Sequence, residues 1–104
     1  MQFDESANNQ AVTVKANGEF SLTLPEVRTA GYRWTLKTGP EPACMLLEEI
    51  AEPNPAGVGG AGHHVWRFRG VAPGTCEIEL HYARPWESSS GPAKTFRMKV
   101  EVRS

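Results

Sequence analysis

The sequence predicts an all-β protein, an immunoglobulin-like β-sandwich of about seven antiparallel strands. Three observations favour this fold. Apolar and polar residues alternate with a period of two along five separate stretches of the chain, as they do in strands with one buried face. The 10 Gly and 8 Pro residues cluster between these stretches, where turns are needed. A chain of 104 residues is also about the length of one such sandwich.

The strands can be placed in chain order from this alternation. Val12 and Val14 indicate a short opening strand. The five clear stretches are residues 20–24, 32–36, 66–69, 76–82 and 96–102. Trp34 falls within the second of them, where the core of a sandwich needs a large aromatic side chain. Segment 45–50 would also suit one helical turn, but the prolines on both sides of it favour a strand.

Composition excludes several classes of protein. Lys and Arg number 11 against 12 Asp and Glu, so the chain lacks the basic surface of a nucleic-acid-binding protein. No apolar run approaches the roughly 20 residues of a membrane span. We therefore expect one domain over residues 11–104, after a flexible N-terminal segment 1–10, and a monomer when the protein is free.

Three connections between the predicted strands differ from the others in length or composition. They cover residues 25–31, 53–62 and 83–93, whereas the alternate connections cover 16–18, 38–43 and 70–74. Because successive strands run up and down, every second connection should lie at the same end of the sandwich. The three together contain 28 residues, and one side of a standard protein interface uses roughly 20–30. This predicts a protein partner rather than a small molecule.

The side chains of these connections support a binding role. Segment 57–60 (GVGG) has almost no side chains, so the backbone of a partner could pair with it, although a flexible linker would have the same composition. Arg84 and Trp86 are residue types common at interface hot spots, and Pro85 between them restricts the chain before binding. The alternative for Trp86 is an indole folded back over the edge of the sandwich.

Three motifs in these regions resemble those of a known family. They are Gly31-Tyr32-Arg33-Trp34, then Gly57-Val58-Gly59-Gly60, then Tyr82-Ala83-Arg84-Pro85-Trp86-Glu87. Their order and spacing are similar to those of the chagasin family of cysteine-peptidase inhibitors, and the resemblance runs from about residue 10 to the end. It implies a sandwich that inhibits papain-like cysteine peptidases reversibly, with three loops laid across the active-site cleft. It implies neither an enzyme nor a cofactor.

The resemblance also implies which residues bind the peptidase. Thr29 and Ala30 would lie over the catalytic pair, and Gly59 and Gly60 would follow one arm of the cleft. Trp86 would pack on the other arm, while Arg84 pairs with a carboxylate or braces its own loop. The expected peptidase-binding residues are Arg28, Thr29, Ala30, Gly31, Tyr32, Gly57, Gly59, Gly60, Arg84, Pro85 and Trp86.

Two alternatives remain open. The family typically has Asn-Pro-Thr-Thr-Gly in the first loop, whereas residues 27–31 read VRTAG. The main alternative is therefore an immunoglobulin-like interaction module that has lost peptidase inhibition. A metal or catalytic site would need His63, His64 and His81, but the first two are neighbours in a strand and point to opposite faces. Asp4 is the only Asp, and no carboxylate completes a triad.

The cysteines and the N-terminus leave other questions open. Cys44 and Cys76 are too few for a disulfide framework and have no metal-binding spacing. We expect both to be buried near the end opposite the three loops, where a disulfide between them is geometrically allowed. Residues 1–10 do not form a signal peptide. The expected location is the cytoplasm as the chain stands, or the periplasm or the exterior if a leader has been removed.

Overall fold

The computed structural model describes residues 1–26, 31–38, 42–52, 62–84, 86 and 91–104. This part of the chain contains eight strands and one short 3-10 turn. The elements are β1 (Gln2–Phe3), η1 (Glu5–Ala7), β2 (Gln10–Lys15), β3 (Glu19–Glu26), β4 (Arg33–Thr38), β5 (Cys44–Glu52), β6 (Gly62–Gly70), β7 (Gly74–Ala83) and β8 (Lys94–Arg103). Among these residues, no helix has the length and apolar character needed to cross a membrane.

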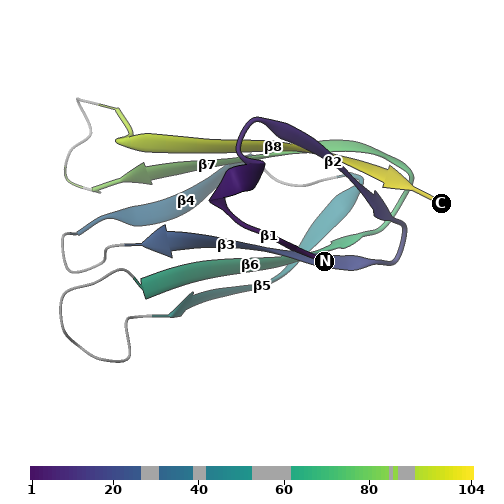
Figure 1. The fold of residues 1–104 in the computed structure, drawn as a ribbon, viewed down its shortest axis with the longest axis horizontal. Helices are drawn as coiled ribbons and strands as arrows, with labels where there is room; N and C mark the ends of the chain where they lie inside the picture. Colours follow the sequence, from purple (N-terminus) through teal and green to yellow (C-terminus); the bar gives the residue numbers. More distant parts are fainter. Residues whose placement is uncertain (27–30, 39–41, 53–61, 85, 87–90) are drawn as a thin grey trace.

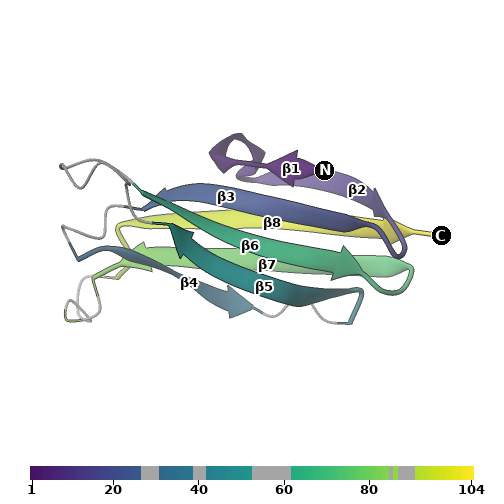
Figure 2. The same cartoon turned by 90° about the horizontal axis from the view of Figure 1, so that it is seen from below.

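The described strands form two packed sheets. The first has the strand order β1-β3-β6-β5 and the second has the order β2-β8-β7-β4; Figures 1 and 2 show them lying one against the other. Most neighbouring strands are antiparallel, as predicted, but β1 pairs with β3 and β2 pairs with β8 in parallel. Parallel pairing needs a long connection rather than a hairpin, and both pairs are separated by at least a dozen residues of chain. The sheets are therefore mixed.

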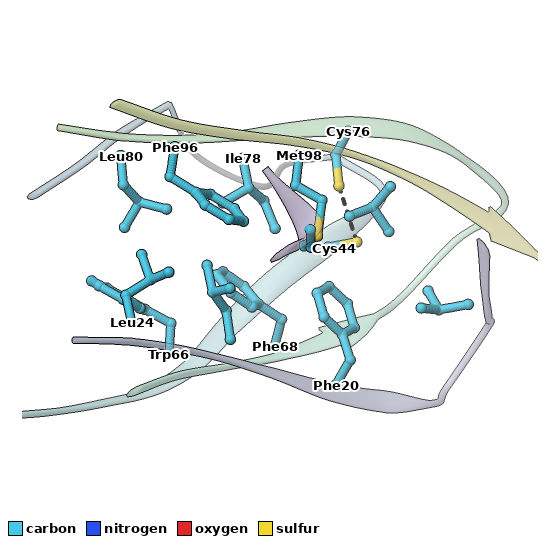
Figure 3. Packing of buried hydrophobic residues seen from close by; sticks show 14 of the residues in the cluster. Phe20, Leu24, Cys44, Trp66, Phe68, Cys76, Ile78, Leu80, Phe96 and Met98 are labelled. Carbon is cyan, nitrogen blue, oxygen red and sulfur yellow. Dashed lines mark hydrogen bonds between the residues drawn. The ribbon is translucent and has the colours of Figure 1, made fainter. Parts of the chain in front are cut away.

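The core lies between the sheets and consists of the apolar rows that the alternation predicted. Phe20 and Phe68 stack with ring centroids 5.2 Å apart, and Figure 3 shows them pointing, with Trp66, toward Ile78 and Met98 of the other sheet. The buried row of the second sheet consists of Val14, Trp34, Cys76, Ile78, Leu80, Tyr82, Phe96, Met98, Val100 and Val102. Burial of these two rows is the main force that holds the sheets together.

Segment 45–50 is a strand, as the prolines around it indicated. It forms the middle of β5, the edge strand that pairs with β6. The pairing register shifts between Leu46 and Glu48, so one extra residue is accommodated there, as in a β-bulge. The bulge explains why the apolar residues of this segment do not alternate strictly, and why both a helical turn and a strand fitted the pattern.

Residues 1–10, for which the sequence suggested a flexible segment, contain β1 and η1. The carboxylate of Asp4 accepts a hydrogen bond from the Ser6 N–H at 2.9 Å and caps the 3-10 turn. Ala7 at the end of this turn is buried against the core. The N-terminal residues therefore extend the first sheet at the edge where β1 joins β3.

Six strand termini lie at one end of the sandwich. β3, β5 and β7 end there, and β4, β6 and β8 begin there, at the left of Figure 1. The connections expected to carry the binding residues join these termini, although residues 27–30, 53–61, 85 and 87–90 lie outside the described part of the chain. We call this end the motif end, because the three sequence motifs adjoin it. Cys44 and Cys76 lie toward the other end, as expected.

The stacked pair at the centre of the core leads to a stability prediction. Phe68→Ala should lower the free energy of unfolding by about 3–5 kcal/mol, because it removes a fully buried ring and leaves a cavity. Met45→Ala is the control, since Met45 is 44% exposed, and it should change the free energy by no more than about 0.5 kcal/mol. Urea denaturation of the three proteins measures both values, and equal losses would contradict the described packing.

Candidate functional site

Trp86 rests on the backbone of Gly31 at the motif end. A Cβ atom built on Gly31 would lie 2.3 Å from Cη2 of the Trp86 indole, far closer than real Cβ contacts. Gly31 also has a φ of +85°, which side-chain-bearing residues rarely adopt. Trp86 nevertheless stays 69% exposed. The indole is therefore supported from below by the first motif and presents most of its surface outward, rather than being folded away over the sandwich edge.

Stacked aromatic rings support the neighbouring Arg84. The rings of Tyr32 and Tyr82 stack with centroids 5.0 Å apart, and Trp34 packs on Tyr82 at 4.7 Å. The guanidinium carbon of Arg84 lies 4.5 Å from the centroid of the Tyr32 ring. A cation above an aromatic face is worth about 0.5–1 kcal/mol at an exposed site. The Tyr32 ring thus supports Arg84, and this contact joins the third motif to the first.

A buried carboxylate holds the two ends of the first motif region. Glu26, the last residue of β3, is only 1% exposed, and its Oε2 accepts a hydrogen bond from the backbone N–H of Trp34 at 2.8 Å. The indole N–H of Trp34 donates to the carbonyl oxygen of Pro25 at 2.9 Å. Because β3 belongs to the first sheet and β4 to the second, these two bonds join the sheets where the chain crosses between them.

His64 links this carboxylate to the next pair of strands. Its Nδ1 lies 2.8 Å from Oε2 of Glu26 and its Nε2 lies 2.7 Å from Oε1 of Glu49. The ring is 5% exposed and stacks on Trp66 with centroids 4.1 Å apart. Only an imidazolium can donate at both nitrogens, so two ionised carboxylates would require the charged form of His64. The cluster therefore joins β3, β5 and β6 by directional bonds.

Glu26 and His64 organise this end of the fold but were not predicted to do so, although the sequence contains a signal for them. Glu26 continues the inward row of Phe20, Leu22 and Leu24, and His64 continues the inward row of Trp66. The connection predicted over residues 25–31 includes Glu26, whereas in the structure Glu26 is the last residue of β3. A polar residue that stays in phase with such a row, next to a motif, indicates a buried polar network.

Four of the predicted peptidase-binding residues are described, and the structure brings them together. Gly31 contacts Trp86, and Tyr32 contacts Arg84. The other predicted residues lie outside the described part of the chain: Arg28, Thr29, Ala30, Gly57, Gly59, Gly60 and Pro85.

The three histidines do not form a common site. His63 is exposed and His64 is buried, since they alternate along β6. His81 pairs with Glu79 at 2.8 Å on the second sheet, and this hydrogen bond, followed by one from Arg97, lowers the pKa of the Glu79 carboxyl. No group of three or more metal-ligating side chains occurs among the residues that the structure describes.

An exposed indole supported on the Gly31 backbone and a guanidinium above the Tyr32 ring lie side by side at one end of the sandwich, an arrangement typical of protein-binding surfaces. The chagasin family peptidase inhibitor I42 model matches residues 13–100 of the chain. The chain therefore belongs to the chagasin family of peptidase inhibitors, which are not enzymes. The family and the immunoglobulin-like fold predicted from the three motifs and the strand pattern are confirmed.

Individual relatives match over almost the whole chain. Amoebiasin-2 from Entamoeba histolytica is 26% identical over 101 residues, which cover 95% of this chain and 82% of that protein. The crystal structure of the cysteine protease inhibitor EhICP2 from the same organism matches with a TM-score of 0.84 at 20% identity, covering 98% of this chain and 93% of that one. The structure of PbICP-C in complex with falcipain-2 matches with a TM-score of 0.66 at 19% identity, covering 99% and 90%.

The contact between Gly31 and Trp86 can be tested with a matched pair of substitutions. Gly31 and Gly91 both have positive φ values, but a Cβ on Gly91 would meet nothing within 4 Å. Both alanine variants should lose about 1–2 kcal/mol from backbone strain, whereas only Gly31→Ala should also displace the Trp86 indole. The indole N–H resonance of Trp86, measured by NMR in both variants, reports that displacement. Equal resonances in the two variants would contradict the contact.

Proposed function

We propose that the protein is a reversible inhibitor of papain-like cysteine peptidases and that the motif end covers their active-site cleft. The observation that carries this proposal is the exposed Trp86, supported on Gly31 beside Arg84 and Tyr32. Membership of the chagasin family supports an inhibitory role. The relatives EhICP2, a cysteine protease inhibitor, and PbICP-C, which was solved in complex with falcipain-2, support a cysteine peptidase as the partner.

The mechanism follows from the chemistry of the target. A papain-like peptidase keeps a Cys thiolate beside a protonated His in an open groove. An inhibitor needs only to fill this groove with a peptide whose carbonyl carbon is out of line for attack. In this proposal Thr29 and Ala30 lie over the catalytic pair, and Gly31 permits the turn that follows them. The protein is neither cleaved nor bound covalently in this proposal, so it can dissociate intact and inhibition is reversible.

The flanking contacts supply most of the affinity in this proposal. Gly57, Gly59 and Gly60 offer their backbone N–H and C=O groups to one arm of the cleft. The exposed face of Trp86 packs on an apolar surface of the other arm, where a buried indole contributes strongly to binding. Because the indole already rests on Gly31, little conformational entropy remains to be lost when it docks.

Residues 27–30 influence the choice of peptidase. Arg28 places a cation where the family typically has Pro, and an apolar or cationic subsite would reject it, whereas an acidic subsite would accept it. The same departure supports the second candidate function, an immunoglobulin-like interaction module without inhibitory activity. A panel of papain-family enzymes separates the two functions, since the module would inhibit none of them at micromolar concentration.

Trp86→Ala tests the role of the exposed indole. The substitution should raise the inhibition constant for a papain-like enzyme at least about tenfold, because truncation of a hot-spot aromatic costs about 2 kcal/mol or more. Val71→Ala is the control, since Val71 is also exposed, at 42%, but follows β6 at the other end of the sandwich. An inhibition constant unchanged by Trp86→Ala would rule out the proposed role of the indole.

A further inference from the structure

We propose that the hydrogen-bonded network around the buried Glu26 and His64 is a positioning device for inhibition, which fixes the strand termini of the motif end relative to one another. This inference rests on the proposed function, because its effect is measured on peptidase binding. None of the network residues was expected to touch a peptidase. In this proposal the network residues act through the residues that touch the peptidase.

The network connects four strands without a gap. Glu49 on β5 contacts His64 on β6 at 2.7 Å, and His64 contacts Glu26 on β3 at 2.8 Å. Oε2 of Glu26 then accepts a hydrogen bond from the backbone N–H of Trp34 on β4, also at 2.8 Å. Each step is a hydrogen bond with a defined direction, so each strand has little freedom to slide past the next.

Aromatic stacking extends these contacts to the remaining connection. Trp34 packs on Tyr82 of β7, and Tyr82 stacks on Tyr32, whose ring lies beneath Arg84. The carbonyl oxygen of Tyr82 also accepts a hydrogen bond from the N–H of Ala93 at 2.8 Å. This bond joins the two chain segments on either side of the third motif connection. The described strands that flank all three motif connections are therefore joined by one continuous set of contacts.

The energetics favour a positioning role over a contribution to stability alone. A buried carboxylate and a buried imidazole lose their hydration, and apolar residues of similar volume often stabilise a core at least as well as such a buried polar pair. Apolar contacts, however, have no preferred direction. Glu26 is almost completely buried among apolar rows, at 1% exposure, and its bonds fix the orientation of the segment that contains Gly31 and Tyr32. When a binding surface is already fixed before association, less conformational entropy is lost on binding.

Two near-isosteric variants test this inference. Glu26→Gln keeps an oxygen acceptor for the Trp34 N–H but removes the charge that faces His64, and His64→Gln cannot donate on both sides in the geometry of an imidazole. Each should raise the inhibition constant for a papain-like enzyme about tenfold, as expected when a pre-organised surface is loosened. Glu26→Gln is the milder change and keeps the test usable if His64→Gln does not fold.

A core variant of equal stability is the matched control. Ile78 is fully buried on β7 and makes none of the described hydrogen bonds of the network. Ile78→Val or Ile78→Ala is chosen so that its thermal midpoint matches that of the network variant, and it should leave the inhibition constant within about twofold. If the control raises the constant as much as Glu26→Gln does, the network is only structural and the inference is overturned.

Failure of the inference is distinguishable from failure of the proposed function. If the wild-type protein inhibits no papain-like enzyme, the proposed function fails, and the positioning role for inhibition fails with it. If the wild type inhibits but neither network variant weakens inhibition, only the positioning role fails. NMR of the free proteins adds a direct readout: the Gly31 amide and Trp86 indole resonances should shift in Glu26→Gln and stay in place in the Ile78 control.

A second inference rests on a separate observation toward the other end of the sandwich. The Sγ atoms of Cys44 and Cys76 lie 3.1 Å apart, and both residues are buried. Cys44 opens β5 of the first sheet and Cys76 belongs to β7 of the second, and Figure 3 shows the two thiols pointing at each other across the core. We propose that this pair is an oxidation site, at which a small disulfide such as glutathione disulfide converts the two free thiols into a disulfide between the sheets.

The chemistry balances as two thiol–disulfide exchanges. One protein thiolate attacks the oxidant, forms a mixed disulfide and releases one glutathione thiol. The second protein thiolate then attacks the protein sulfur of that mixed disulfide and releases the other glutathione. The protein loses two electrons and two protons, and the oxidant gains them. Burial raises the pKa of both thiols, and that of Cys76 to about 12. Thiolate is therefore scarce in the folded protein, and exchange should be slow until the core opens.

Oxidation by glutathione disulfide tests this site directly. Protein refolded with the oxidant should contain no free thiol when it is titrated in denaturant, and its intact mass should be lower by two hydrogens. Its thermal midpoint should exceed that of the reduced form, because the cross-link restricts the unfolded chain. The control is Cys44→Ser, whose thermal midpoint should not rise after the same treatment. Two titratable thiols after oxidative refolding, or glutathione retained on the wild-type protein as a mixed disulfide, would overturn this proposal.

Discussion

The carboxylate of Glu26 is the constraint on which the geometry of the motif end depends. The two sheets are held together mainly by apolar contact, which is strong but has no preferred direction. Glu26 adds two directional contacts within the core, one to the Trp34 N–H in the other sheet and one to His64 on the neighbouring strand. The position at which the chain crosses from β3 to β4 is thereby fixed. Gly31 and Tyr32 lie within that crossing, so their placement depends on this buried side chain together with the stacking of Tyr32 on Tyr82.

The exposed part of the candidate site follows from this fixed base. Trp86 can remain mostly exposed and still be held in place, because the backbone of Gly31 supports one side of its indole. Arg84 is held in the same way by the Tyr32 ring. Large exposed side chains normally lose much rotational freedom when they bind. Here the Gly31 backbone and the Tyr32 ring remove part of that freedom in advance, which suits the binding role proposed for this surface.

The sequence predicted the parts of this structure that depend on a repeating local pattern. Alternation of apolar residues located the strands, because one face of each sheet is buried along its whole length. The parallel pairing of β2 with β8 was not predictable, since it depends on contacts between opposite ends of the chain. Glu26 and His64 were missed for a different reason. Their phase within the buried rows indicates burial, but the partners that they bond lie in other strands and cannot be identified from one strand alone.

The contacts also explain why the first and third motifs occur together in this sequence. Gly31 of the first motif meets Trp86 of the third, and Trp34 of the first packs on Tyr82 of the third. The two motifs are therefore one structural unit, although about fifty residues of chain separate them. In the proposed function, the departure of residues 27–30 from the usual family sequence bears on which peptidase is bound.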